Sequence, residues 1–254
     1  MTVPATGQVA KLVRHPIKSA GYELVDRVAL TRDTAFPFDR VWAVAHAAAR
    51  LPLPLAWAPK LQFLRGWGSA DLMAISCVSD VANSAVTLSH PRCPTETFRP
   101  DDPADAARLI DWLRPLWPEN RPEPAQVIHV PGQALTDQDQ PLVSINSLSS
   151  LADLSARMGR DLSVHRWRGN IWVDGWAPWA ELDLIGREIT VGTARLVVVE
   201  PIGRCRATGA NPDTGVQDAD TMAALEAEYG HTDFGIFARV IASGDVALGD
   251  EVRI

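Results

Sequence analysis

The sequence predicts a mainly β protein with a few helices. Short segments of β-branched or alternating apolar residues recur between glycine- and proline-containing turns, a pattern typical of small barrels and sandwiches. Only three stretches combine helical periodicity with capping residues. Residues 118–124 hold three prolines among mostly polar neighbours, so this stretch is the best candidate for a domain boundary.

In the first half, strands are predicted by period-two alternation and β-branched content. They cover residues 7–13, 24–30, 40–45, 72–76 and 85–89. A helix follows from Pro103, with Asp102 as its cap, and ends before Pro115. Ala107, Ile110 and Leu113 share one face of this helix.

The second half begins with a strand at residues 126–130. A helix starts at Ser147 and ends at Gly159, and another covers residues 221–229 and ends at Gly230. Residues 188–191 and 194–199 are expected to pair as a hairpin through Gly192. Closing strands are predicted at residues 235–241 and 245–254, with turns at residues 244–245 and 249–250.

The amino-acid composition limits the classes of protein to which the chain can belong. The chain has 254 residues, 46% of them hydrophobic, which is enough for substantial cores. A net charge of -7 argues against a nucleic-acid or acidic-membrane partner. Three cysteines without a C-x-x-C pair fit a reducing compartment. No leader-like start and no uncharged apolar run of membrane-spanning length is present, so a cytoplasmic location without membrane contact is expected.

The residues around Cys205 form the most informative stretch of the chain. A β-branched run enters it, glycines and a proline break it, and Cys205 stands between Arg204 and Arg206. Neighbouring guanidinium groups favour the thiolate, which is both the nucleophilic and the metal-ligating form of cysteine. The alternative is that Cys205 only packs as a small hydrophobe, which its charged neighbours disfavour.

Three weaker signals are open to two interpretations each. Lys18 and Ser19 in an irregular turn either bind an oxyanion or lie on a solvated loop. Arg166 and Arg168, which strand alternation would place on one side, either recognise an anion with Asn170 or form a solvated face. His90 and Cys93 have an H-x-x-C spacing, but two ligands do not make a metal site.

Several motifs in a shared order resemble the MOSC family, named for the C-terminal domain of molybdenum cofactor sulfurase, in its form with an N-terminal β-barrel domain. They are His15-Pro16-Ile17-Lys18-Ser19, Asp39-Arg40-Val41-Trp42, the Ser147 helix start, Trp167-Arg168-Gly169-Asn170-Ile171, Gly203-Arg204-Cys205 and Asn211-Pro212-Asp213-Thr214-Gly215. The resemblance implies an N-terminal MOSC-associated β-barrel domain with a linking helix at residues 1–120 and a MOSC β-barrel domain at residues 121–254.

The resemblance also implies a cofactor and a reaction. The chain is similar to the mitochondrial amidoxime reducing component and to bacterial reductases of N-hydroxylated bases, so Cys205 is expected to bind the molybdenum of a molybdopterin cofactor. A soft thiolate suits a metal already held by sulfur. The residues matched to cofactor-binding positions are Lys18, Ser19, Arg40, Ser147, Arg168, Asn170, Gly203 and Arg204. Electrons are expected from a separate protein of ferredoxin or flavin-reductase type.

The chain differs from the family pattern at two glycines. Gly169 stands where relatives often have proline, and Gly203 stands where some relatives carry serine. Asp213 and His165 are candidate proton donors, each with a structural alternative. A persulfide-based sulfur carrier on Cys205 and a non-catalytic cofactor-binding module are the alternative functions. Pyridoxal phosphate is disfavoured because only Lys18 lies in a suitable place for its aldimine.

Overall fold

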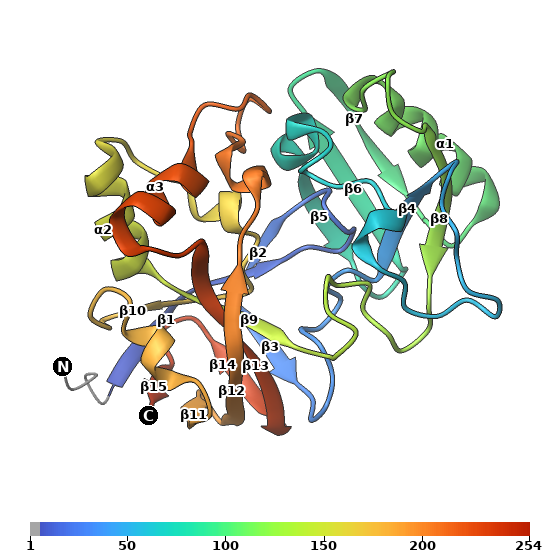
Figure 1. Cartoon of the computed structure of the whole chain (residues 1–254). Coiled ribbons are helices and arrows are strands. Elements are labelled where there is room, and N and C mark those ends of the chain that lie inside the picture. Colours follow the sequence, from blue (N-terminus) through green and yellow to red (C-terminus); the bar gives the residue numbers. More distant parts are fainter. Residues whose placement is uncertain (1–5) are drawn as a thin grey trace.

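The structure, a computed structural model, describes residues 6–254 and consists of two lobes side by side (Figure 1). One lobe is a β-barrel built from the beginning and the second half of the chain. The smaller lobe holds most of residues 42–129. The prediction of a mainly β fold with three α-helices is confirmed.

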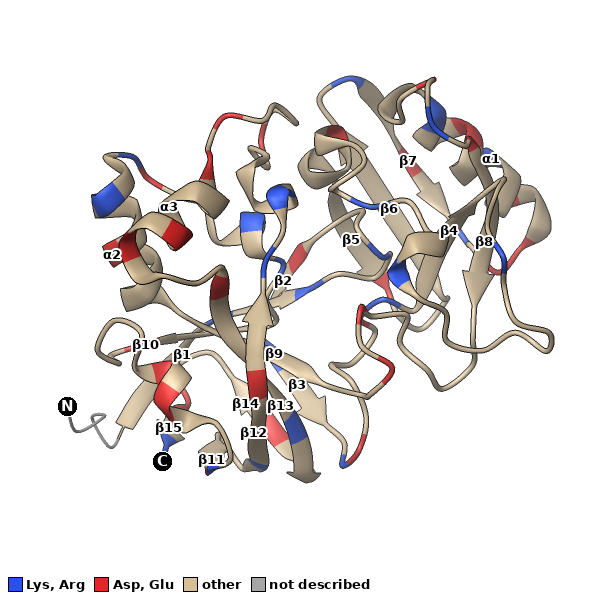
Figure 2. Ribbon diagram, viewed as in Figure 1, with Lys and Arg blue, Asp and Glu red and all other residues tan. Residues whose placement is uncertain are grey.

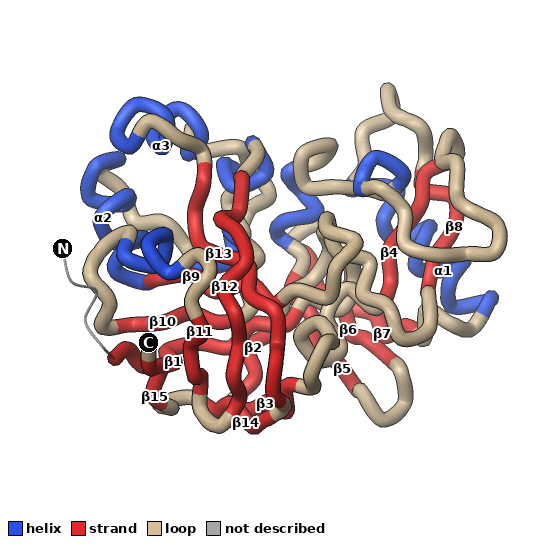
Figure 3. Tube along the Cα trace, turned by 60° about the horizontal axis from the view of Figure 1, so that its bottom comes forward, coloured by secondary structure: helices blue, strands red, loops and turns tan. Residues whose placement is uncertain are grey.

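The barrel is a closed ring of seven strands, because β1 pairs with both β10 and β15. Around the ring the order is β10-β9-β13-β12-β11-β15-β1, and β9 and β10 are its parallel pair (Figure 3). The strands are β1 (Thr6–Arg14), β9 (Val143–Ser147), β10 (Ile171–Asp174), β11 (Glu188–Val191), β12 (Ala194–Gly203), β13 (Asp233–Ala242) and β15 (Glu251–Arg253).

Alternating burial explains why these segments form a barrel. In β11, Ile189 and Val191 are buried in the barrel core, whereas Glu188 is exposed. The hairpin between β11 and β12 turns at Gly192, whose φ of 57° lies in the left-handed region that glycine tolerates. The predicted hairpin is therefore confirmed.

Two helices cover one end of the barrel (Figure 1). Ser147 caps α2 (Leu148–Met158) by accepting a hydrogen bond from the amide of Ser150, and Gly159 ends it with a φ of 63°. Asp220 caps α3 (Thr221–Tyr229) in the same way. Both helices agree with the capping signals in the sequence.

The smaller lobe contains two small sheets and one helix around a core that includes Trp42, Leu72 and Trp112. Asp102 caps the helix through the amides of Ala104 and Asp105, as predicted. One sheet pairs β4 (Trp42–His46) with β8 (Pro124–His129), and the other has β5 (Ser76–Asp80), β6 (Ala85–His90) and β7 (Cys93–Phe98); the helix is α1 (Pro103–Leu113).

Strand pairing does not follow the expected division between residues 120 and 121. β1 lies before that point but completes the barrel, and β8 lies after it but pairs with β4 in the smaller lobe. The chain therefore crosses between the lobes twice. The division into domains at residues 1–120 and 121–254 stays a prediction. Residues 1–5 of the first expected domain lie outside the part of the chain that the structure describes.

Three of the expected elements need correction. Residues 24–30 form two strands, β2 (Glu23–Val25) on β1 and β3 (Arg27–Leu30) on β14 (Gly244–Ala247), because the chain changes sheet at Asp26. The expected turn at residues 244–245 therefore lies within β14. A strand was expected at residues 72–76, but residues 70–74 form a 3-10 turn and the strand β5 begins at Ser76. A short buried apolar run does not by its periodicity distinguish a strand from a helical turn. Two strands were not predicted from the sequence: β7, whose exposed polar residues obscure its pairing with β6, and the buried barrel strand β9.

Among residues 6–254, no helix has both the length and the apolar character needed to cross a membrane.

One buried carboxyl group lies behind α2. Glu181 is fully buried, and its Oε2 accepts a 2.8 Å hydrogen bond from Ser150 Oγ, while its Oε1 has no partner among the described residues. Burial raises the pKa of Glu181 from 4.5 to about 7. Ionised Glu181 is therefore poorly accommodated in the folded protein.

Glu181→Gln should remove a pH dependence of stability. Between pH 4.5 and 7 the unfolded chain loses the Glu181 proton while the folded protein keeps it, so the free energy of unfolding falls as pH rises and levels off above 7. Relative to wild type, we expect the variant to gain about 3 kcal/mol at pH 8 and little at pH 4. Urea unfolding at both pH values measures this, with the exposed Glu188→Gln as control; a gain independent of pH would contradict the assignment.

Candidate functional site

A cavity of about 520 Å³ lies where the two lobes meet. It takes residues from the turn after β1, from the smaller lobe, from the segment that leads into β9, and from the segments that follow β12 and the 3-10 turn at Val164–Trp167. A volume of this size is within the usual range for small-molecule sites. Eight of the ten site residues expected from the sequence line it: Lys18, Ser19, Arg40, Arg168, Asn170, Gly203, Arg204 and Cys205.

The other two expected residues are not in the cavity lining. Ser147 is buried and its hydroxyl serves as the cap of α2. Asp213 is exposed in a turn, where its amide donates to Asn211 Oδ1. His165, the other candidate proton donor, stacks on Tyr22 outside the lining, and burial lowers its pKa to about 4. The structure therefore brings neither candidate proton donor into the cavity.

Cys205 lies directly after β12 and is the exposed one of the three cysteines. Its carbonyl oxygen accepts hydrogen bonds from the amide of Thr208 and from Thr208 Oγ1, at 3.1 and 3.0 Å. The Thr208 hydroxyl lies 2.5 Å from that of Thr221 at the start of α3. The backbone that carries the thiol is thus attached to the helix layer.

The carboxylate of Asp218 stabilises the loop that follows Cys205. Asp218 Oδ1 accepts from Arg166 at 2.7 Å, and Oδ2 accepts from Arg160 at 3.0 Å and Asn211 at 2.9 Å. Asn211 also forms the turn of the Asn-Pro-Asp-Thr-Gly motif, whose Gly215 packs against the backbone of Asp71 in the smaller lobe. The motif is therefore a folded contact between the lobes.

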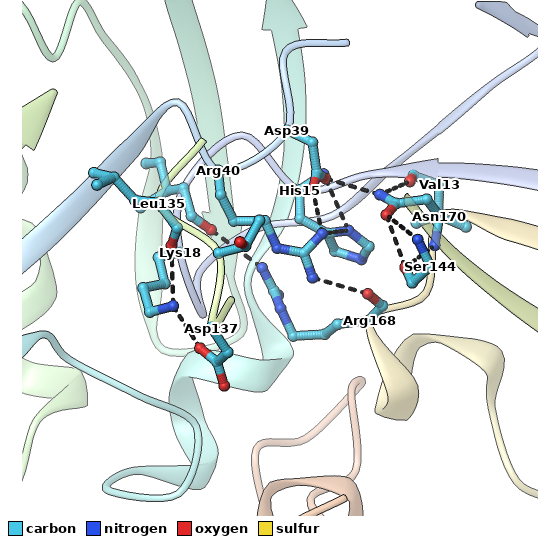
Figure 4. A network of polar contacts seen from close by, with 12 residues as sticks. Val13, His15, Lys18, Asp39, Arg40, Leu135, Asp137, Ser144, Arg168 and Asn170 are labelled. Atoms are coloured by element: carbon cyan, nitrogen blue, oxygen red, sulfur yellow. Dashed lines mark hydrogen bonds and ion pairs between the residues drawn. The ribbon is translucent and has the colours of Figure 1, made fainter. Parts of the chain in front are cut away.

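A buried carboxylate, Asp39, is the centre of the polar network in Figure 4. Its Oδ1 accepts from the amide of His15 at 2.8 Å and from Asn170 Nδ2 at 3.0 Å, and its Oδ2 accepts from Arg40. Burial alone would raise the pKa of Asp39, but Arg40 and His15 outweigh it and hold the pKa well below its usual range. Asp39 is therefore ionised in the folded protein.

His15 and Asn170 complete this network: His15 Nδ1 lies 3.3 Å from Asp39, and both polar atoms of the Asn170 side chain have partners. Burial, with Arg40 and Arg168 nearby, lowers the pKa of His15, so the imidazole is neutral at pH 7. Asn170 Oδ1 accepts from Ser144 Oγ at 2.7 Å, and Asn170 Nδ2 also donates to the carbonyl of Val13. The Asn170 side chain thus joins β1, β9 and Asp39.

The two arginines next to Asp39 donate to backbone carbonyls of the cavity loops. Arg40 Nη2 donates to the carbonyl of Arg168 at 2.9 Å. The Arg168 guanidinium in turn donates to the carbonyls of Ile17 and Gly21 at 3.1 and 3.2 Å. Both residues have φ near 49°, a conformation that costs energy outside glycine and that these contacts maintain. The expectation that strand alternation orients Arg166 and Arg168 is wrong, because they lie in and directly after a 3-10 turn.

Lys18 forms a second cross-link. Its side chain is buried, and its Nζ donates to the carbonyl of Leu135 at 2.9 Å and to Asp137 at 2.5 Å. Burial lowers the pKa of Lys18, and Asp137 opposes this. One N–H of the ammonium group remains for a ligand. Ser19, which follows with a φ of 62°, lines the same cavity.

Arg204 anchors the strand that precedes Cys205. Its guanidinium donates to the carbonyls of Trp167 and Phe234 and to Asn146 Oδ1, and it lies over the rings of both aromatic residues. Asn146 is buried between Gly169 and Gly235, where a Cβ would come within 2.0 and 1.9 Å of its amide. Glycine at 169 therefore makes room for the Asn146 amide.

Sequence reasoning missed several residues of the site. Asn146, Asp137 and Asp218 position expected residues, and their partners are between 52 and 119 residues away along the chain. Lys60, Arg65 and Trp67 line the cavity from loops of the smaller lobe. Nothing in their local sequence sets them apart from surface residues, so only the pairing of distant segments identifies them.

The cavity is strongly positive in an acidic protein. Seven cationic residues line it against two acids, Asp39 and Asp137, and the Lys and Arg segments gather where the lobes face each other (Figure 2). The cations are Lys18, Arg40, Lys60, Arg65, Arg166, Arg168 and Arg204. A ligand that carries negative charge fits this lining.

Within residues 6–254, no group of three or more His, Cys, Asp and Glu side chains could together hold a metal ion. Cys205 is the one cysteine among the described residues that line the positive cavity.

The profile of the family described as MOSC domain matches residues 132–253. The chain is 30% identical over 122 residues to mitochondrial amidoxime reducing component 2 of Bos taurus, a match that covers 43% of this chain and 36% of that protein. The chain therefore spans about a third of the length of that relative.

Two solved structures are similar to parts or all of the fold. The YuaD protein from Bacillus subtilis has a TM-score of 0.46 and 14% identity, with 99% of this chain and 96% of that chain covered. YiiM from Geobacillus stearothermophilus has a TM-score of 0.35 and 19% identity, with 44% and 52% covered.

Gly169→Ala should destabilise the protein through Asn146. The new methyl group would collide with the Asn146 amide, and such overpacking costs about 1–3 kcal/mol. In an Asn146→Ala background the same substitution should cost at least about 1 kcal/mol less, which a double-mutant cycle of urea unfolding measures. Gly203→Ala is the matched control, because its Cβ would lie 3.6 Å from Asp233; additive effects at 146 and 169 would contradict the contact.

Asp39→Asn should destabilise the protein more than any surface change of the same type. The amide cannot accept from Arg40, His15 and Asn170 together, and breaking a buried ion pair costs about 3–5 kcal/mol. Asp33→Asn, which breaks the exposed contact with Arg32, should cost less than about 1 kcal/mol. Equal shifts of the urea midpoint in both variants would show that Asp39 is not a cross-link.

Proposed function

We propose, from the match of residues 132–253 to the MOSC domain family, that this protein binds a molybdenum cofactor through Cys205 and reduces N-hydroxylated compounds. The observation that carries the proposal is the meeting of one exposed thiol and seven cationic side chains at a single cavity. The similarity to an amidoxime reducing component supports the reaction class.

The residues present fit such a cofactor. The Cys205 thiolate would supply one soft ligand to molybdenum whose other sulfur ligands come from the pterin dithiolene. The remaining N–H of Lys18, the Ser19 hydroxyl and the unused N–H groups of Arg40 would hold the phosphate. Gly203 leaves space beside the thiol, since it has no side chain in the lining.

The roles of the other expected residues are indirect. Asn170 and Arg204 already use most of their donors on carbonyl and side-chain acceptors of the protein, and Arg168 donates to the carbonyls of Ile17 and Gly21. We therefore assign them to positioning: Arg204 orients the strand before Cys205, and Arg168 and Asn170 hold the Lys18 turn against the barrel. Their positive charge still contributes to the field in the cavity.

The chemistry that follows is a two-electron reduction. An N-hydroxylated substrate takes up two electrons and two protons, its N–O bond breaks, and the amine or amidine and one water leave. The bound cofactor would supply the oxygen-accepting centre, and a separate donor protein of ferredoxin or flavin-reductase type would supply the electrons. The protein itself binds the substrate in the cavity and limits access of water, since the two lobes enclose the site.

Cys205→Ser should remove the metal. Protein purified from a host that makes the cofactor should contain molybdenum and pterin in about equal amounts, while the variant should lose most of its molybdenum because serine is a harder and weaker ligand. Cys93→Ser, at the smaller lobe's β6–β7 hairpin, is the control and should keep its metal. A Cys205→Ser protein that keeps its full metal content would contradict the proposal.

The exposure of Cys205 also favours a second candidate, a sulfur carrier with a persulfide on this thiol. Mass spectrometry of untreated protein separates the two functions. A carrier should show one extra, reducible sulfur atom on Cys205, whereas a reductase should show bound pterin and no such addition. Bound pterin without reduction of any N-hydroxylated compound, given an electron donor, would instead indicate a binding module.

A further inference from the structure

We propose that the mouth of the cavity contains an anion subsite around Trp67, which selects N-hydroxylated substrates that carry a carboxylate or phosphate group. The inference rests on the proposed function and adds its substrate class. Three arginines lie over the ring of Trp67: Arg121 at 4.9 Å, Arg206 at 5.0 Å and Arg65 at 5.5 Å from the ring centre. They come from three separate segments of the chain.

The arginines of this group, called the Trp67 cluster below, lack acidic partners. No ion pair links Arg65, Arg121 or Arg206 to a carboxylate in the described part of the chain, whereas Arg40 and Arg166 each have one. All three guanidinium groups lie within 5.5 Å of one ring centre, so their separations are no greater than about the Debye length of ~10 Å and the like charges repel one another. An anion placed among them would relieve that repulsion.

Contacts of the backbone hold the Trp67 cluster in place. Ser69 is buried and its hydroxyl donates to the carbonyl of Leu116 at 2.6 Å, while the ring of Trp117 lies against Gly68. Gly66 packs against Met73 and Ala207, so close that a Cβ there would lie 2.5 Å from the Met73 sulfur. The loop that carries Arg65 and Trp67 is thus fixed against the 3-10 turn that follows Cys205. A preorganised site binds its ligand with little ordering cost.

The position of the cluster relative to Cys205 points to a substrate group. Arg206 is the next residue after Cys205, and Arg65 and Trp67 line the same cavity as the thiol. The cofactor phosphate is assigned to Lys18, Ser19 and Arg40, which belong to other segments of the lining. A ligand whose reactive nitrogen is near Cys205 would therefore have its far end at the Trp67 cluster, where an aromatic ring packs on the indole and an anionic group meets the guanidinium fork.

The test compares two probes that differ only in charge, benzamidoxime with a 4-carboxylate and benzamidoxime with a 4-carboxamide. Dissociation constants are measured by calorimetry with the cofactor-loaded protein at low and high salt. We expect the carboxylate probe to bind about tenfold more tightly, and this ratio to fall at high salt because partly exposed charges are screened.

Variants that each remove one arginine test whether the Trp67 cluster causes the preference for the carboxylate probe. Arg121→Gln and Arg206→Gln should each bring the affinity ratio of the two probes down to about twofold, since each removes one fork from the cluster. Arg195→Gln, at an exposed arginine on β12 that is not one of those over the Trp67 ring, should leave the ratio unchanged.

The outcomes separate this inference from the proposed function. Reduction of both probes with equal dissociation constants would overturn the anion subsite and leave the reductase function intact. Preferential binding of the carboxylate probe, lost in the two variants, supports the subsite even if neither probe is reduced. Unchanged affinities together with slower electron delivery in Arg206→Gln would assign the cluster to docking of an acidic donor protein and overturn the inference.

Discussion

The buried carboxylate of Asp39 is the interaction on which the site depends. It accepts hydrogen bonds from His15, Arg40 and Asn170, which belong to the turn after β1, the entry to β4 and the loop before β10. A buried charge without partners would cost several kcal/mol, so the three segments are stable only together. The network therefore fixes how the smaller lobe is seated on the barrel, and with it the cavity between them.

Hydrogen-bond partners give different roles to arginines that look alike in the sequence. Arg40, Arg168 and Arg204 each donate to backbone carbonyls of neighbouring loops. Arginine suits this task because its planar fork bridges two acceptors and keeps its charge when buried. Other side chains at the cavity keep capacity for a ligand: the Cys205 thiol, the Ser19 hydroxyl, one N–H of Lys18 and the arginines of the Trp67 cluster.

Closure of the barrel explains why both halves of the chain meet at one cavity. β1 inserts between β10 and β15, so the turn that carries Lys18 emerges beside the loops that carry Asn170 and Cys205. The chain then leaves to form the smaller lobe and returns through β8. The lobes consequently cannot be separated at one point of the sequence, and the cavity lies between segments more than a hundred residues apart.

The sequence by itself determined the local features, because they depend on neighbouring residues. Asp102, Ser147 and Asp220 cap the predicted helices, Gly192 forms the predicted hairpin turn, and eight of the site residues expected from the resemblance line the cavity. Only the tertiary structure decided which donors remain for a ligand. Asn170 and Arg204 look like binding residues until Ser144, Asn146 and Phe234 are seen to occupy their hydrogen bonds. Those partners, like the arginines around Trp67, are brought in by strand pairing across the chain, which leaves no trace in the spacing of residues.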